Sequence, residues 1–197
     1  YHAMEASATI GKHLEVVYNG LEVEDYPYSD KKEDYFLFFS RISRFKGAHE
    51  AINAAKMLNV PLKVAGEDVM TGDPAYAMQI MQSCDGKQIK YLGCVTEDKK
   101  KELMGKARAL ILPLLWNEPF GLVAIEAMAC GTPVITMARG AMPELITHRK
   151  TGYLCQNMTE IMTAMKMVDE IAPSECRLRA KEFSLDKMVE NYLKLYE

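Results

Sequence analysis

Short apolar runs alternate with helical patterns from residue 35 onward. Runs at 35–39, 61–66, 89–92, 109–112, 134–136 and 153–155 have the length and apolar character of buried strands. Helical patterns cover 48–58, 73–84, 96–107 and 119–130, and two or three further helices follow residue 159. Strands joined by helices of this length form βαβ units with right-handed crossovers. The pattern therefore predicts an α/β domain, with a parallel Rossmann-like sheet of about six strands and helices on both faces.

Residues 1–34 precede this alternation and show no sustained period, although 16–18 predict a short strand. We expect 1–34 to be an interdomain lead-in and the end of a missing N-terminal domain. Residues 35–197 then form the ligand-binding domain, C-terminal helices included. The chain starts with Tyr1, so we expect it to be a piece of something longer.

Composition narrows the class of protein. A net charge of -3 gives no support to a nucleic-acid partner, and no apolar run is long enough to cross a membrane. Five cysteines without CxxC spacing indicate reduced thiols in a cytoplasmic protein. The four histidines lack ligand spacing, so no metal site is predicted. Motifs GxSxG, HExxH, GxxxxGK[ST] and, after the first strand, GxGxxG are missing, which argues against the corresponding hydrolase and nucleotide sites.

Two glutamates mark the segment NEPFGLVAIEAMACGTPVI at 117–135. Its helical part is apolar nearly all round and so predicted to be buried, yet it carries Glu126 in its middle and Glu118 just before its start. A buried carboxylate without partners costs several kcal/mol. In a continuous helix the two lie about 12 Å apart along the axis, too far for a glycosidase pair at about 5 to 9.5 Å. They could hold the two ends of one extended ligand.

A nucleotide diphosphate sugar suits this geometry, because free N–H groups at Phe120, Gly121 and Leu122 favour a phosphate between the two carboxylates. The alternative is intramolecular: Glu126 pairs with a buried Arg or the backbone, and Glu118 caps the helix. On these residues alone the two interpretations are even.

Two cations leave the first strand at the same sheet edge as Glu118. Arg41 and Lys46 lie in the segment SRISRFKG and could neutralise a diphosphate. The alternative is a solvated basic loop that includes Arg44.

These motifs resemble those of a known family. NEPFGLVAIEAMACGTPVI is similar to the signature of retaining glycosyltransferases of family 4, and SRISRFKG resembles their GR-L-x-x-x-KG loop. VVYNGLEVEDY resembles the entry to their C-terminal domain, and RGAMPELITHRKTGYL their later G-G-x-x-E stretch. The resemblance covers nearly all of 15–197 and implies the C-terminal, donor-binding half of a two-domain GT-B fold.

The resemblance also implies residue roles. Arg41, Lys46 and Glu118 become the catalytic residues: the cations bind the diphosphate and stabilise the leaving nucleotide, and Glu118 contacts the donor sugar. The donor-binding set implied is Arg41, Lys46, Val95, Glu97, Glu118, Phe120, Gly121, Leu122 and Glu126. In it, Glu126 holds the ribose and Val95 covers the base, while Glu97 either accepts from a guanine or only balances a helix dipole. Ser40 and Ala141 replace glycines of the family pattern and are expected to add bulk near the phosphates.

The implied activity is transfer of a hexose from a UDP- or GDP-sugar to an acceptor hydroxyl, with retention and without metal or cofactor. The acceptor site is expected in the absent N-terminal domain, so this chain is incomplete for turnover. The resemblance allows peripheral membrane contact through that missing half. Two other functions stay open: a non-catalytic nucleotide-sugar-binding module or subunit, and a sugar-nucleotide epimerase, which the glutamate spacing disfavours.

Overall fold

A six-stranded parallel sheet forms the centre of the computed structural model, which describes residues 14–66 and 73–196. The strand order is β3-β2-β1-β4-β5-β6. Their bounds are β1 Phe36–Phe39, β2 Leu62–Ala65, β3 Ile89–Gly93, β4 Leu110–Leu112, β5 Val134–Met137 and β6 Gly152–Cys155. The six predicted strands are therefore confirmed, and those at the centre of the sheet are buried on both faces, as their apolar runs indicate.

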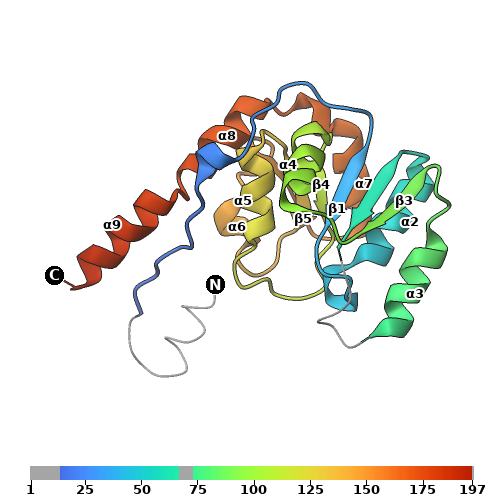
Figure 1. Ribbon diagram of the computed structural model, residues 1–197, viewed down its shortest axis with the longest axis horizontal. Coiled ribbons are helices and arrows are strands. Elements are labelled where there is room, and N and C mark those ends of the chain that lie inside the picture. The colour runs from blue at the N-terminus through green and yellow to red at the C-terminus, as the bar shows by residue number, and fades with distance from the viewer. Residues whose placement is uncertain (1–13, 67–72, 197) are drawn as a thin grey trace.

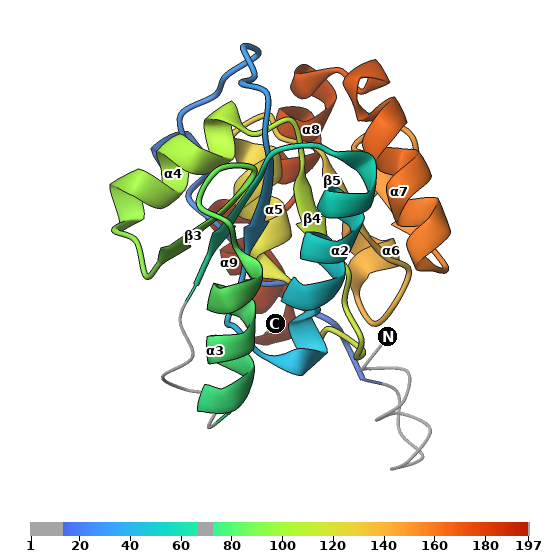
Figure 2. The same ribbon diagram turned by 90° about the vertical axis from the view of Figure 1, so that its right-hand side faces the viewer.

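Helices cover both faces of the sheet, α4, α5 and α8 on one and α2, α3 and α7 on the other (Figures 1 and 2). The helices are α2 Ala48–Leu58, α3 Pro74–Ser83, α4 Glu97–Lys106, α5 Leu122–Ala129, α6 Met142–Leu145, α7 Met158–Met167, α8 Pro173–Lys181 and α9 Leu185–Tyr196. Single 3-10 turns lie at η1 Val23–Asp25, η2 Arg44–Lys46 and η3 Val168–Glu170. In the described part of the chain, none of these helices is long and apolar enough to cross a membrane.

The lead-in packs against the domain without forming the strand predicted at 16–18, so that prediction is wrong. Residues 14–20 are irregular, and the chain pairs at Leu21 instead, whose N–H donates to the Phe183 carbonyl at 3.0 Å. The Leu185 N–H returns a bond of 3.0 Å to the Leu21 carbonyl. Within the described residues, 16–18 pair with no strand of the sheet, so an extended conformation there has no neighbouring strand to bond with.

The helix predicted from Pro119 begins later, at Leu122. Gly121 is its N-cap, with φ of 100°, a left-handed conformation that interrupts any helix running in from Pro119. The preceding segment bonds elsewhere, because the Glu118 carbonyl accepts from the Ala141 N–H at 2.9 Å. The 12 Å spacing of the two glutamates assumed a continuous helix and does not apply.

Thr96 caps α4 as its position in the sequence predicts, since its hydroxyl accepts from the Lys99 N–H at 3.3 Å. We expect Thr96→Ala to lower the free energy of unfolding by about 1 kcal/mol, because it leaves an N-terminal amide unpaired. Urea unfolding measures the change. Thr163→Ala is the control, because the Thr163 hydroxyl only bonds back to the Thr159 carbonyl inside α7. An equal loss in both variants contradicts the capping role.

Burial lowers the pKa of Lys32 from 10.5 to about 8. Its ammonium donates to the Gly105 carbonyl at 2.9 Å and to the Thr132 hydroxyl at 2.8 Å. Between these two pKa values the unfolded chain binds the proton more tightly than the folded one, so this group's contribution to stability rises with pH across the interval. Lys32→Met should remove that rise. We expect the free energy of unfolding of the parent, relative to that of the variant, to be about 2 kcal/mol higher at pH 9.5 than at pH 7.5 in urea unfolding. A pH-independent difference contradicts this.

Candidate functional site

Two loops meet at the carboxyl edge of the sheet, where the strand order reverses between β1 and β4. The β1 loop is 40–47 and the β4 loop is 113–121. The Leu115 N–H donates to the Phe45 carbonyl at 2.8 Å. Gly47 has φ of 77°, and a Cβ there would lie 2.2 Å from the Pro113 carbonyl oxygen, so only glycine allows this approach. Open α/β sheets bind their ligands at such a reversal, which makes this the candidate site.

Lys46 and Glu118 form an ion pair across the two loops. The Lys46 ammonium lies 2.5 Å from Glu118 Oε2, and the Trp116 indole N–H donates to the same oxygen at 3.0 Å. The ammonium also lies 4.8 Å from the centre of the indole ring. The two charged side chains are only 11% and 13% exposed, so each depends on the other to offset the cost of burial. Glu118 does not cap α5, whose N-cap is Gly121.

Arg41 lines the same cleft as Lys46. The cleft has a volume of about 390 Å³ and is lined by Arg41, Ser43, Arg44, Phe45, Lys46, Asp73 and Trp116. The sequence placed both cations at this edge, and the structure brings them together. Arg44 is mostly exposed, with its guanidinium 3.0 Å from Asp73 and 4.8 Å from the centre of the Tyr76 ring. The alternative of a solvated basic loop therefore fits the exposed Arg41 and Arg44 but not the buried Lys46.

Glu126 has intramolecular partners, as the alternative interpretation required, but they are a lysine and a tyrosine. Its Oε1 accepts from the Lys100 ammonium at 2.9 Å and from the Tyr26 hydroxyl at 3.1 Å. Among the described residues Oε2 has no hydrogen bond, and the side chain is 16% exposed. The geometry of Glu126 is thus compatible with a structural role and with a ligand on its second oxygen.

Lys100 joins Glu126 to Glu97, the first residue of α4, whose carboxylate lies 2.8 Å from the ammonium. Burial disfavours the charge on Lys100, but its bonds to the two glutamates outweigh this and raise its pKa. Burial and the negative charge of Glu126 raise the pKa of Tyr26, which keeps its hydroxyl a donor. Lys100 therefore stays an ammonium, and Tyr26 a phenol, at neutral pH.

The remaining predicted residues lie around the start of α5 or before α4. Phe120 stacks on Tyr18 at 6.0 Å between ring centres, so its side chain belongs to the contact with the lead-in. Leu122 is exposed. The Ala124 N–H donates to the Gly121 carbonyl at 2.9 Å, so within α5 the amides without a carbonyl partner are those of Leu122 and Val123. Val95 is half-buried in the loop between β3 and α4. Ala141 is buried, so its extra methyl lies in the interior rather than in the cleft, contrary to what the substitution suggested.

Sequence reasoning missed three contacts of this site, because the neighbouring residues indicate them weakly or not at all. Trp116 precedes Glu118 by two residues. An indole so close in sequence to an acidic residue is only a weak indication of a hydrogen bond between them. Lys100 follows Glu97 by three residues on α4, a spacing that favours an ion pair. Tyr26 lies 100 residues from Glu126, and nothing in the local sequence indicates the contact.

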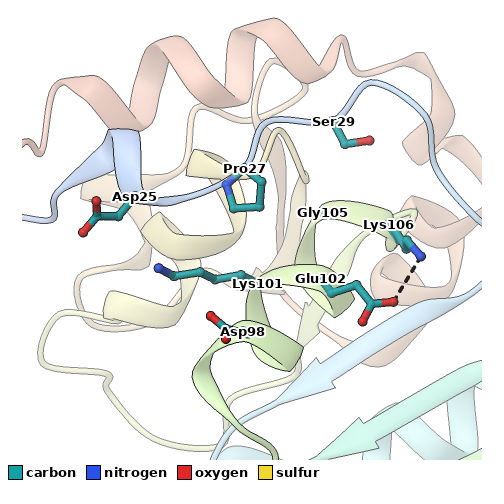
Figure 3. Close-up of a pocket in the computed structure, with 8 residues that line it drawn as sticks. All are labelled: Asp25, Pro27, Ser29, Asp98, Lys101, Glu102, Gly105 and Lys106. Atoms are coloured by element: carbon teal, nitrogen blue, oxygen red, sulfur yellow. Dashed lines mark hydrogen bonds and ion pairs between the residues drawn. The ribbon is translucent and has the colours of Figure 1, made fainter.

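A larger hollow lies between the lead-in and α4 (Figure 3). It has a volume of about 490 Å³ and is lined by Asp25, Pro27, Ser29, Asp98, Lys101, Glu102, Gly105 and Lys106. Its charges are mixed, and Glu102 already pairs with Lys106 at 3.1 Å. It contains none of the predicted site residues, and it is not lined by the loops at the reversal of strand order. We therefore place the candidate site in the smaller cleft.

Within residues 14–66 and 73–196, no three histidine, cysteine or acidic side chains gather as metal ligands do. The cleft supplies cations in their place. Arg41 and Lys46 give positive charge for an anionic ligand, and Glu118 gives an acceptor for hydroxyls. The expectation that the reaction needs no metal or cofactor stays a prediction.

Comparison with known proteins identifies relatives of this arrangement. The model of the family described as glycosyl transferases group 1 matches residues 25–182. Glycogen synthase of Mycobacterium tuberculosis is 28% identical over 182 residues, which cover 85% of this chain and 42% of that protein. The N-acetyl-alpha-D-glucosaminyl L-malate synthase of Bacillus anthracis is 27% identical over 209 residues, covering 94% and 54%. The chain thus spans about half the length of these two relatives.

Solved structures show the same fold. AviGT4, a glycosyltransferase involved in avilamycin A biosynthesis, superposes with a TM-score of 0.81 and 24% identity over 100% of this chain and 61% of its own. Anabaena HepE in complex with UDP gives a TM-score of 0.83 and 22% identity over 98% of this chain and 60% of its own. The predicted fold, a parallel Rossmann-like sheet as in one half of GT-B glycosyltransferases, is confirmed.

Proposed function

The chain belongs to the group 1 glycosyltransferases, and from that premise we propose that it is the donor-binding part of a retaining hexosyltransferase. Its donor is a UDP- or GDP-sugar and its acceptor group a hydroxyl. The acceptor-binding domain is proposed to lie in the part of the relatives' length that this chain does not span.

One observation carries the proposal, the buried contact of Lys46 with Glu118 where the strand order reverses. A diphosphate needs fixed positive charge, and a sugar needs a hydrogen-bond acceptor beside it. Lys46 and Glu118 supply both 2.5 Å apart, and Arg41 lines the same cleft. The structures of HepE in complex with UDP and with UDP-glucose, which share this fold, support a nucleotide-sugar donor.

The nucleoside half of the donor is assigned to the opposite side of the start of α5. Tyr26 and Lys100 hold Glu126 through Oε1, and we assign Oε2 to the ribose hydroxyls. Val95 is assigned to the face of the base. Glu97 is assigned to its edge, where its carboxylate could accept from a guanine.

The proposed chemistry is electrostatic. As the bond between the sugar and the phosphate breaks, negative charge grows on the departing nucleotide. Arg41, Lys46 and the first amides of α5 stabilise that charge from fixed positions. The acceptor hydroxyl attacks the face that the phosphate leaves, which retains configuration, and a phosphate oxygen takes its proton. The diphosphate takes over part of the interaction between Lys46 and Glu118. The Glu118 carboxylate can then accept hydrogen bonds from the sugar hydroxyls.

Calorimetric titration of the chain with UDP, GDP and ADP tests the donor assignment. We expect UDP or GDP to bind most tightly. Glu126→Gln should lower the affinity for the nucleotide by about 10-fold to 100-fold, the usual contribution of hydrogen bonds to a charged group. Glu190→Gln, an exposed glutamate on α9, is the control and should change nothing. Equal affinity of the parent and Glu126→Gln leaves Glu126 with a structural role only.

Failure of all three nucleotides to bind contradicts the proposed function as a whole. Where a nucleotide does bind, turnover by the full-length protein distinguishes the remaining functions. A full-length protein that binds the nucleotide but transfers no sugar is a binding module, and one that epimerises the donor without acceptor is an epimerase.

A further inference from the structure

The outer wall of the cleft is aromatic, although the proposed diphosphate site needs only its cations. Phe45 is 63% exposed, unusual for so large an apolar ring. Its ring lies 6.4 Å from that of Trp116, tilted by 38°. The two rings come from the β1 loop and the β4 loop, which the bond between Leu115 and Phe45 holds together. We call Phe45 and Trp116 the aromatic lip.

Polar groups face the same cleft from its other side. Asp73 accepts from the Tyr76 N–H through Oδ1 at 2.9 Å and from the Arg44 guanidinium through Oδ2 at 3.0 Å. Both Asp73 and Arg44 line the cleft together with the lip. Each carboxylate oxygen has lone pairs left, and the guanidinium has further N–H donors. The cleft therefore combines an exposed apolar surface with unsaturated donors and acceptors, the usual character of a small-molecule site.

The lip touches the proposed reaction centre. Trp116 donates to Glu118 Oε2 at 3.0 Å, the same oxygen that contacts Lys46. A ring lying on the lip would therefore be beside the carboxylate assigned to the donor sugar.

We propose that the aromatic lip, with Asp73 and Arg44, is this chain's contribution to the acceptor site and binds a pyranose ring of a carbohydrate acceptor, whose other contacts come from the acceptor-binding domain; this rests on the proposed function. One face of a pyranose carries C–H groups, whose slight positive charge suits the negative faces of the two rings. Its hydroxyls donate to Asp73 and accept from Arg44. An alkyl chain fits the lip but makes no hydrogen bond with the further lone pairs of Asp73 or the further N–H donors of Arg44. A phosphate suits the cations but gains nothing from the rings.

The chain carries its own probe, because Trp116 is its only tryptophan. The experiment measures tryptophan fluorescence of the chain during titration with methyl α-glucoside, methyl α-mannoside and methyl α-galactoside. We expect a saturable change with at least one of them. Phe45→Ala should weaken that binding about 10-fold, within the usual value of an aromatic contact. Phe45→Tyr keeps the ring and should bind as the parent does.

Two further variants separate the lip from general effects. Asp73→Asn should weaken glycoside binding, although asparagine still caps α3. Met57→Ala is the control, because Met57 is exposed on α2 and does not line the cleft. No saturable change with any glycoside overturns the proposal, and so does a change that octanol produces as strongly as the glycosides.

Calorimetry of the same preparations distinguishes failure of this proposal from failure of the proposed function. Chain that binds UDP or GDP but no glycoside refutes the acceptor site and leaves the donor site standing. Chain that binds glycosides on the lip but no nucleotide refutes the donor assignment instead, and the role of the ring as an acceptor is then refuted with it.

Discussion

Lys46→Met should reduce turnover of the full-length protein about 100-fold to 1000-fold and weaken nucleotide binding to the chain in the same direction. The ammonium is the buried cation of the cleft, and removing one such group from a site that stabilises growing negative charge costs this much. Lys166→Met, an exposed lysine on α7, should leave both quantities unchanged. Calorimetry with UDP and GDP, and sugar transfer by the full-length protein, are the measurements.

The same variant should also lose stability, which has to be separated from function. Without Lys46, Glu118 keeps a nearly buried charge, and among the described residues its carboxylate retains the hydrogen bond from the Trp116 indole, so we expect a loss of about 3 kcal/mol. Lys46→Met combined with Glu118→Gln removes that charge and should recover most of the stability in urea unfolding. It should not recover nucleotide binding. Recovery of binding in the double variant contradicts the role of Lys46 as a phosphate ligand.

The sequence predicts the fold, and the sheet edge at which the candidate residues gather, because both depend on local patterns. Short apolar runs such as 36–39 have no other environment than a doubly covered sheet. Once the strands are known, the sheet edge that bears Arg41, Lys46 and Glu118 follows from parallel topology. The sequence therefore predicts that Lys46 and Glu118 lie at the same edge of the sheet, although 72 residues separate them.

Partners that depend on distant packing were not within reach. Nothing near Glu126 indicates that Tyr26 of the lead-in and Lys100 of α4 meet at its Oε1. The late start of α5 has the same cause. Pro119 suits a first helical position, but Gly121 adopts a left-handed conformation and the carbonyl of Glu118 bonds to Ala141 in the loop after β5, so the helix begins only at Leu122.

The loop after β5 holds in place the backbone of Glu118, the carboxylate that we assign to the donor sugar. Gly140 has φ of 58°, and a Cβ on it would lie 2.3 Å from the Glu118 carbonyl oxygen and 2.4 Å from its nitrogen. Gly140→Ala must therefore displace the backbone of Glu118. We expect a loss of about 3 kcal/mol or more in urea unfolding, from the left-handed conformation and the clash together. UDP or GDP affinity should fall at least about 10-fold, because a displaced backbone misplaces groups that need near-exact geometry.

Gly86→Ala separates the cost of the left-handed conformation from the effect of the steric clash with Glu118. Gly86 has φ of 71°, so alanine there also meets the left-handed region, but nothing lies within 4 Å of its Cβ position. This variant should lose only about 1 to 2 kcal/mol and keep full nucleotide affinity. The difference between the two variants then measures how firmly the loop after β5 fixes Glu118. Equal losses of stability with unchanged affinity would mean that Glu118 is positioned by Lys46 and Trp116 alone, and that the loop after β5 only follows it.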